Sequence, residues 1–244
     1  LINEGKINLQ WGDDFQMVEC SGADAAAQIV KNIYLKEIQM YGMEQVQILS
    51  PYKMRSAAGV LELNRSLQDE VNPPVFGKRE IHLGGEIFRE GDRILQNKNT
   101  EFASNGDLGT LVQIAEDEDN NPLVQIVFTD GRRVKYEAEQ VEMIEHANAI
   151  TIHKSQGSEC QVVIIPWLKA FYPMLKRNIF YTGITRAKQR VYIVGEWKAV
   201  CQAIHTDDTG TRKTMLAVKI QQYYERYQRQ ENRRIPATIC NRAV

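Results

Sequence analysis

The most informative stretch of the chain reads ITIHKSQGSE at positions 150–159, and the apolar run CQVVIIP follows it directly at 160–166. It places Thr, His, Lys, Ser and Gln side chains together between two apolar segments. Open α/β sheets bind their ligands at the carboxyl ends of strands. A polar cluster in this position therefore predicts a ligand site.

Four residues of this stretch have the chemistry of a phosphate site. Thr151, His153 and Ser155 carry donors of the kind that hold phosphates. Gly157 would let a ligand approach the backbone closely. The alternative is a polar loop in which Ser155 or Ser158 only caps the next element, and the residues alone leave both interpretations open.

Around this stretch, the apolar pattern alternates between helices and strands. Helical spacing predicts helices over residues 24–41, 60–71 and 174–182, and a charged helix over 215–230. Apolar or alternating runs predict strands over residues 45–51, 149–153, 161–166 and 190–194. Strands that alternate with helices predict an α/β domain.

The sequence pattern changes near residue 84, from helices and strands in alternation to short strands alone. Short β-like runs cover residues 92–95, 109–114, 123–128 and 133–136, and turn sequences containing Asn-Gly-Asp or Asp-Gly separate them. Such closely spaced short strands predict a small barrel inserted into the α/β domain.

The composition of the 244 residues is that of an ordinary globular protein, with 43% apolar and 25% charged residues. No run approaches the roughly 18 apolar residues of a membrane span, and nothing at the start resembles a signal peptide. The four cysteines form no CxxC pair, which argues against a zinc site and favours reduced thiols. We expect a cytoplasmic protein with no metal ligands and no membrane contact. Because the chain begins with Leu1, we expect a piece of a longer protein.

The net charge of −1 conceals a split along the chain. Residues 1–150 hold 14 Lys and Arg against 25 Asp and Glu, whereas residues 151–244 hold 16 against 6. Local charge decides phosphate affinity, so the basic part predicts a surface for a polyanion. The alternative, in which these cations only solvate exposed helices, stays open.

A second cluster reads YTGITRAK at positions 181–188, beside the predicted strand at 190–194. A fixed guanidinium that reaches across an interface is the usual means of stabilising charge on a transferring γ-phosphate, which makes Arg186 a candidate. The alternative is an ordinary basic helix end that complements the helix dipole.

Together and in this order, the two clusters resemble motifs V and VI of superfamily 1 helicases. The His-Lys-Ser form of motif V is similar to the RecD-like branch of superfamily 1B, which includes the alpha subunit of exodeoxyribonuclease V. The resemblance extends over about residues 15–218. It includes Gln47-Ile48-Leu49-Ser50-Pro51, Gly59-Val60, Leu63-Asn64, Leu67-Gln68, Asn72-Pro73, Phe88-Arg89-Glu90-Gly91-Asp92-Arg93, Asn105-Gly106-Asp107-Leu108-Gly109 and Thr211-Arg212-Lys213-Thr214.

The resemblance implies an α/β fold of three parts. The second RecA-like helicase domain, built on a parallel sheet, would cover residues 1–83 and 147–218. An SH3-like β-barrel insert would cover residues 84–146. A basic helical tail would cover residues 219–244, outside the resemblance.

The resemblance also implies roles for individual residues. Contacts to single-stranded DNA are expected from Thr151, His153, Ser155, Tyr181 and Thr182, with Asn97, Asn105 and Arg93 as candidates in the insert. Contacts to the nucleotide are expected from Gly157, Glu159, Arg186 and Lys188. Arg186 would be the catalytic arginine that reaches the γ-phosphate.

Several of these roles have structural alternatives. Glu159 could pair with a basic neighbour, and His153 could be a satisfied core histidine. Asn105 and Gly106 could be present only for a turn that needs positive φ.

The chain contains no G-x-x-x-x-G-K-[ST] sequence and no recognisable Walker B pair. ATP and Mg²⁺ would therefore be bound mainly by a first RecA-like domain that this chain lacks. We expect the chain alone to hydrolyse ATP poorly or not at all, because Arg186 would have no bound nucleotide to act on.

The expected function is that of the C-terminal part of an ATP-dependent 5′–3′ DNA helicase in repair or recombination. Its partners would be single-stranded DNA, the missing N-terminal helicase domain and other exonuclease V subunits. Two alternatives remain: the helicase part of a conjugative relaxase, and an ATP-independent nucleic-acid-binding or scaffold module.

Overall fold

Five parallel strands form the central sheet of the computed structural model, in the order β1-β12-β11-β2-β10. Their bounds are Phe15–Glu19 (β1), Val46–Ser50 (β2), Ala149–Thr151 (β10), Cys160–Trp167 (β11) and Ala187–Gly195 (β12). The structure describes residues 2–54, 56–83, 85–116, 121–207, 219–225 and 227. The middle strands β11 and β2 are buried along nearly their whole length, which explains the unbroken apolar run at residues 162–165 of β11.

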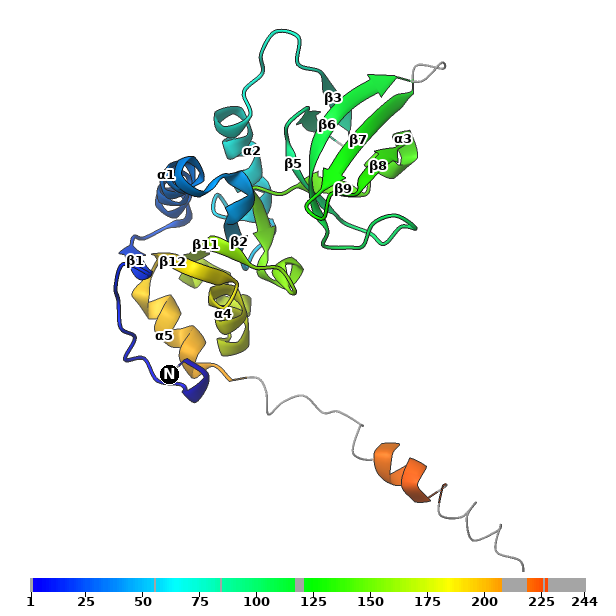
Figure 1. Ribbon diagram of the computed structural model, residues 1–244. Helices are drawn as coiled ribbons and strands as arrows, with labels where there is room; N and C mark the ends of the chain where they lie inside the picture. Colours follow the sequence, from blue (N-terminus) through cyan, green and yellow to red (C-terminus); the bar gives the residue numbers. More distant parts are fainter. Residues whose placement is uncertain are drawn as a thin grey trace, which may run out of the picture. The chain divides into compact units, whose positions relative to one another are not determined.

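Helices cover both faces of this sheet, as Figure 1 shows. The helices α1 (Ala23–Tyr41) and α2 (Val60–Val71) lie on one face, and α4 (Arg177–Ile184) and α5 (Trp197–His205) lie on the other. Short 3₁₀ turns complete this part: η1 (Ile2–Glu4), η2 (Met43–Gln45), η3 (Ile152–Ser155) and η4 (Lys169–Met174). The largest apolar core of the described chain lies between the sheet and these helices.

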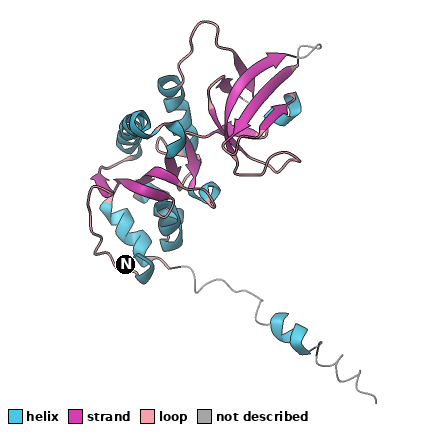
Figure 2. Cartoon of the chain, in the orientation of Figure 1, coloured by secondary structure: helices cyan, strands magenta, loops and turns pink. Residues whose placement is uncertain are grey.

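The insert has a sheet and a core of its own (Figure 2). Its antiparallel sheet has the order β8-β7-β6-β5-β9. The bounds are Arg93–Gln96 (β5), Leu108–Glu116 (β6), Pro122–Phe128 (β7), Arg133–Tyr136 (β8) and Ile144–His146 (β9), with a short helix α3 (Ala138–Val141) before β9. A separate hairpin, β3 (Glu80–Leu83) and β4 (Glu86–Arg89), contributes Ile81 and Phe88 to the insert core.

The insert is not a hydrogen-bonded closed barrel in the described residues. Strands β8 and β9 are the two edges of its sheet, and no pairing joins them there. The expected SH3-like barrel is therefore an open five-stranded sheet. The domain boundaries at residues 83/84 and 146/147 stay predictions, and the β3–β4 hairpin spans the first of them.

Side chains on one face of α2 form hydrogen bonds with both segments that connect the insert to the α/β part. Asn64, Gln68 and Asn72 are spaced four residues apart, so their side chains lie in one row, and all three are buried. The Asn64 amide bonds the backbone of His146 and Ala149, at the exit of the insert.

The other two amides hold the entry of the insert through a buried carboxylate. Gln68 and Asn72 each donate to Asp92 at 2.7 Å, and the backbone N–H of Arg89 donates to the same carboxylate at 2.7 Å. Asp92 is 3% exposed. The polar row of α2 therefore fixes where the insert sits on the α/β part.

Most predicted elements agree with the structure to within a few residues. The helices predicted at 24–41 and 60–71 correspond to α1 and α2. The strand predicted at 149–153 ends at Thr151, because residues 152–155 turn into η3. The helix predicted at 174–182 begins at Arg177, after η4. The strands β1, β3, β4 and β9 and the helices α3 and α5 were not predicted.

Residues 208–244 form a second unit, of which only residues 219–225 and 227 are described. These described residues are helical, in agreement with that part of the helix predicted over 215–230. Thr211, Arg212, Lys213 and Thr214 of the resemblance lie outside the described residues, as does most of the predicted basic tail.

Candidate nucleic-acid interface

The strand-end loop, residues 151–159, turns sharply after β10 because its polar side chains bond its own backbone. The Thr151 hydroxyl accepts from the backbone N–H of Lys154 at 3.3 Å. The Ser155 hydroxyl donates to the Ile152 carbonyl, and the Ser158 hydroxyl donates to the Ser155 carbonyl, both at 2.8 Å. The residue that caps η3 is therefore Thr151, whereas Ser155 and Ser158 bond carbonyls three residues earlier and cap no later element; His153 is exposed and Thr151 is half-buried.

A polar groove of about 640 Å³ lies between this loop and the insert. One wall is the insert turn, residues 105–108, with Thr129; the other is formed by His153, Lys154, Gln156, Gly157 and Ser158. The two walls approach closely at Gly106, where a Cβ atom would lie 3.7 Å from the Lys154 carbonyl oxygen. Gly106 also has a φ of +102°, which favours glycine.

The insert turn is braced by its own hydrogen bonds. The Asn99 side chain accepts from the backbone N–H of Asn105 at 2.7 Å. Asp107 accepts from the backbone N–H of Ser104 at 2.9 Å and from Arg132 at 2.7 Å. The groove therefore has a preformed wall on the insert side.

A polar network joins the loop to the insert beneath this groove. The Lys154 ammonium donates to the side-chain oxygen of Asn97 and lies 3.4 Å from Glu145 Oε2. Glu145 Oε1 accepts from Lys53 at 2.7 Å and from Asn97 at 2.5 Å. The network links the residue after β5, the strand β9, the strand-end loop and the segment after β2.

Arg186 lies between the strand-end loop and α4. Its Nε donates to the Thr182 carbonyl at 3.1 Å, and Nη1 donates to the Ser158 carbonyl at 3.4 Å. Nη2 donates to the Thr185 hydroxyl at 3.3 Å. The guanidinium is partly exposed, and its bonds to neutral groups leave it without a carboxylate partner among the described residues.

Close packing brings the two clusters together. The backbone N–H of Cys160 donates to the Arg186 carbonyl at 3.0 Å. A Cβ atom on Gly183 would lie 3.0 Å from Ile165 Cδ1 and 3.4 Å from Ile152 Cδ1, so glycine lets α4 pack tightly there. The two segments that resemble motifs V and VI thus pack directly against each other.

Glu159 and Lys188 form an ion pair at 3.3 Å, with side chains 59% and 52% exposed. The basic partner considered for Glu159 in the sequence is therefore present. Such exposed pairs are weak, so a ligand can replace either partner.

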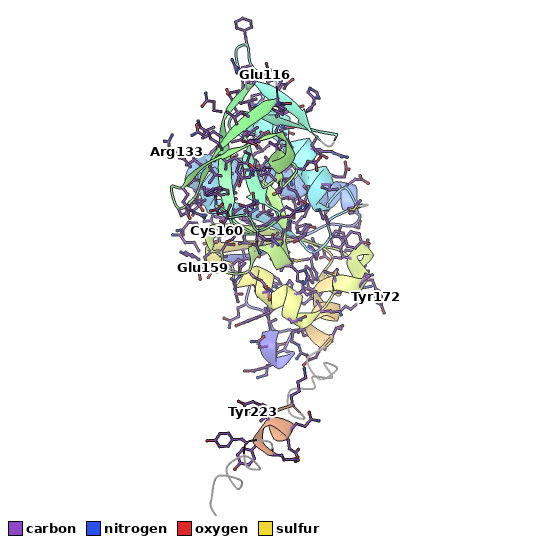
Figure 3. All side chains as sticks on the ribbon, turned by 90° about the vertical axis from the view of Figure 1, so that its right-hand side faces the viewer. Glu116, Arg133, Glu159, Cys160, Tyr172 and Tyr223 are labelled. Atoms are coloured by element: carbon purple, nitrogen blue, oxygen red, sulfur yellow. The ribbon has the colours of Figure 1, made fainter. Side chains whose placement is uncertain are left out.

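Figure 3 shows Glu159 next to Cys160. Burial raises the pKa of the Cys160 thiol to about 11, which makes it a poor nucleophile.

The remaining motif VI residues lie apart from the polar groove. Tyr181 is 39% exposed and lines a separate cavity of about 400 Å³ with Leu9 and Phe15. The Thr182 hydroxyl donates to the Asn178 carbonyl at 2.7 Å, and its own carbonyl accepts from Arg186. Thr182 thus contacts the arginine through its backbone carbonyl, whereas Tyr181 faces the N-terminal segment, and the predicted DNA contacts of both residues stay predictions.

Two predicted DNA contacts serve the fold in this structure. Arg93 is 4% exposed, and its guanidinium donates to the carbonyls of Met43 and Val46 at 2.7 and 2.8 Å. Ser155 is 1% exposed, and its hydroxyl donates within the loop. Both groups are satisfied internally, so we leave both out of the interface.

The groove also contains residues that had no assigned role. Lys154 and Gln156 belong to the stretch at residues 150–159, and their place close to His153 in that stretch was the sequence signal for them. Thr129 reaches the groove only through the folding of the insert, so no local sequence signal identified it, whereas Asp107 belongs to the quoted block 105–109 but had no role of its own there.

The described residues contain no group of three or more metal-ligating His, Cys, Asp or Glu side chains. Among the helices that the structure describes, none combines the length and apolar character needed to cross a membrane.

Comparisons with known proteins identify related domains. Residues 146–194 match the UvrD-like helicase C-terminal domain, and residues 63–128 match the SH3 domain of ATP-dependent RecD-like DNA helicases. The ATP-dependent RecD2 DNA helicase of Deinococcus radiodurans is 29% identical over 189 residues, which are 78% of this chain and 25% of that protein. The RecBCD enzyme subunit RecD of Mycolicibacterium smegmatis is 31% identical over 168 residues, 66% of this chain and 28% of that subunit.

Among solved structures, Bacteroides Pif1 bound to ssDNA matches with a TM-score of 0.44 and 16% identity, over 85% of this chain and 55% of that chain. The chain spans about a quarter of the length of the two curated relatives described above.

Proposed function

Because the chain is RecD-like, with a UvrD-like helicase C-terminal domain and a RecD-like SH3 domain, we propose that it is the C-terminal part of an ATP-dependent DNA helicase. In that role it grips single-stranded DNA and supplies an arginine to the nucleotide. The intact protein moves 5′ to 3′ in DNA repair or recombination, in the cytoplasm, and can assemble with other exonuclease V subunits.

The polar groove between the strand-end loop and the insert is the observation that carries this proposal. It brings His153 and Gly157, which belong to one motif, together with Asn105 of the insert. Its volume of about 640 Å³ and its polar walls suit a sugar-phosphate backbone rather than an apolar ligand. A strand held there contacts both parts of the chain.

His153 lines the groove and Thr151 lies at the end of β10, outside that lining but two residues before His153; both side chains can donate to a phosphate. The Thr151 oxygen accepts from the Lys154 backbone, so its own O–H hydrogen remains available to donate. His153 is exposed at the groove, which excludes its alternative role as a buried core histidine. Contacts of this kind position the strand without reading its sequence.

Arg186 and Glu159 are the proposed nucleotide contacts, with Gly157 and Lys188 beside them. Bound ATP supplies the free energy of phosphoryl transfer, and a separate helicase domain provides the phosphate cradle and the Mg²⁺ ligands. Arg186 stabilises the charge that develops on the γ-phosphate. Glu159 accepts a hydrogen bond from a ribose hydroxyl once its ion pair with Lys188 has opened. The bond from Arg186 to the Ser158 carbonyl couples this site to the strand-end loop.

The grip is tested by replacing Thr151 and His153 together with alanine. We expect the affinity for a labelled single-stranded oligonucleotide to fall by roughly 10-fold at low salt, because two backbone contacts are lost. Fluorescence anisotropy at two salt concentrations measures this change.

The matched control is His205→Ala with Thr206→Ala, a neighbouring histidine–threonine pair at the end of α5. Both side chains bond carbonyls within α5, at Cys201 and Gln202. This control is expected to bind like the original chain. Unchanged affinity in the Thr151→Ala, His153→Ala variant would overturn the grip.

A further inference from the structure

Glu145 stands between two lysines at the boundary of the insert and the α/β part. Its carboxylate lies 2.7 Å from the Lys53 ammonium and 3.4 Å from the Lys154 ammonium. The side chains of Glu145 and Lys154 are 23% and 22% exposed, so water screens this contact less than it screens a surface pair. One carboxylate thus holds two positive charges.

One of the two held lysines lines the groove that is proposed to bind DNA, and the other shares its carboxylate partner. Lys154 lines the polar groove next to His153. Lys53 follows β2, the strand that pairs with β10 just before the strand-end loop. Without Glu145, two further cations would be available beside a phosphate backbone.

Asn97 completes the arrangement and keeps Lys154 oriented. Its side-chain oxygen accepts from the Lys154 ammonium, while its side-chain nitrogen donates to Glu145 at 2.5 Å. Lysine has three donor hydrogens, and this pair of acceptors occupies two of them. Asn97 therefore acts on the groove through Lys154, in place of the direct DNA contact predicted from the sequence.

We propose that Glu145 is a positioning residue that limits the affinity of the groove for single-stranded DNA. It does so by holding Lys154 and Lys53 in ion pairs. A paired lysine binds a DNA phosphate more weakly than a free lysine does. A helicase must release each phosphate as it advances, and a restrained lysine makes that release easier than a free one. This inference rests on the proposed single-strand grip.

The test is the isosteric variant Glu145→Gln, which removes the charge and keeps a side-chain oxygen for Asn97. Its affinity for a fluorescein-labelled oligothymidine is expected to rise by roughly 3- to 10-fold at about 50 mM salt, with a salt slope steeper by about 0.7 for each lysine released. In the double variant Glu145→Gln, Lys154→Gln, most of this gain should vanish.

Glu142→Gln is the matched control, because Glu142 is an exposed carboxylate three residues away. It lowers the negative charge of the same region by the same amount. A gain in Glu145→Gln that does not exceed the gain in this control would overturn the proposal.

A second measurement does not depend on DNA. Limited acetylation read by mass spectrometry should label Lys154 and Lys53 faster in Glu145→Gln than in the original chain, relative to the exposed Lys98. Unchanged labelling would show that Glu145 does not hold the lysines and would overturn the proposal. Labelling could rise while neither the original chain nor Glu145→Gln binds the oligonucleotide. That result would overturn the single-strand grip and, with it, the proposed limit on DNA affinity.

Discussion

Replacing Arg186 with alanine in the full-length protein is expected to lower ATP turnover by roughly 10³-fold or more, because the arginine stabilises charge on the transferring phosphate. Single-strand affinity should change little, since Arg186 does not line the polar groove. The folded structure should persist, because the guanidinium is partly exposed and bonds only neutral groups. Steady-state ATP hydrolysis with saturating oligonucleotide measures the effect.

Two further variants separate a specific role from loss of charge. Arg186→Lys keeps the charge but lacks the planar fork, so it should lose most of the activity as well. Arg133→Ala removes an exposed arginine of the insert and should leave turnover unchanged. Turnover retained in Arg186→Ala would remove this residue from the nucleotide site.

Replacing Asp92 with alanine is expected to lower the free energy of unfolding by about 3–5 kcal/mol. The side chain is 3% exposed and accepts from Gln68, Asn72 and the backbone of Arg89. Alanine would leave the Arg89 N–H without this acceptor and would remove one of the two bonds that each amide donates, since Gln68 also bonds the Ile87 carbonyl and Asn72 the Glu90 carbonyl. The insert would lose its fixed position, so single-strand affinity should fall as well. Urea unfolding followed by circular dichroism measures the stability.

Asp69→Ala is the control for this stability effect. Asp69 lies on the same helix, α2, and its side chain is 71% exposed. It pairs with Arg89, which keeps Glu80 as a second partner. The loss should therefore stay below about 1 kcal/mol. A loss of similar size in both variants would mean that the buried carboxylate does not anchor the insert.

The α/β part of the fold was predictable because its signals are local. Helical spacing identified α1 and α2, and unbroken apolar runs identified β11 and the end of β12. The strand β1 escaped prediction because its sequence FQMVE mixes polar and apolar residues at the edge of the sheet. The three-residue strand β9 is too short to show a period.

The site was predictable only where one motif contains it. His153 and Gly157 were identified from a single continuous stretch, whereas Thr129 and Asp107 join them through the folding of the insert. Arg93 was misassigned to DNA because a buried arginine that bonds backbone carbonyls has the same sequence signature as an exposed one. The role of Glu145 depends on Lys154, nine residues away, and on two partners distant in sequence, and no local pattern indicates it.

Hydrogen exchange with and without a saturating single-stranded oligonucleotide tests the central claim most directly. If the groove between the strand-end loop and the insert holds the strand, peptides covering residues 104–108 and 153–158 should exchange more slowly in the complex, while peptides from α1 should not change. Protection that appears elsewhere in the chain and leaves both groove segments unchanged would contradict the proposed interface.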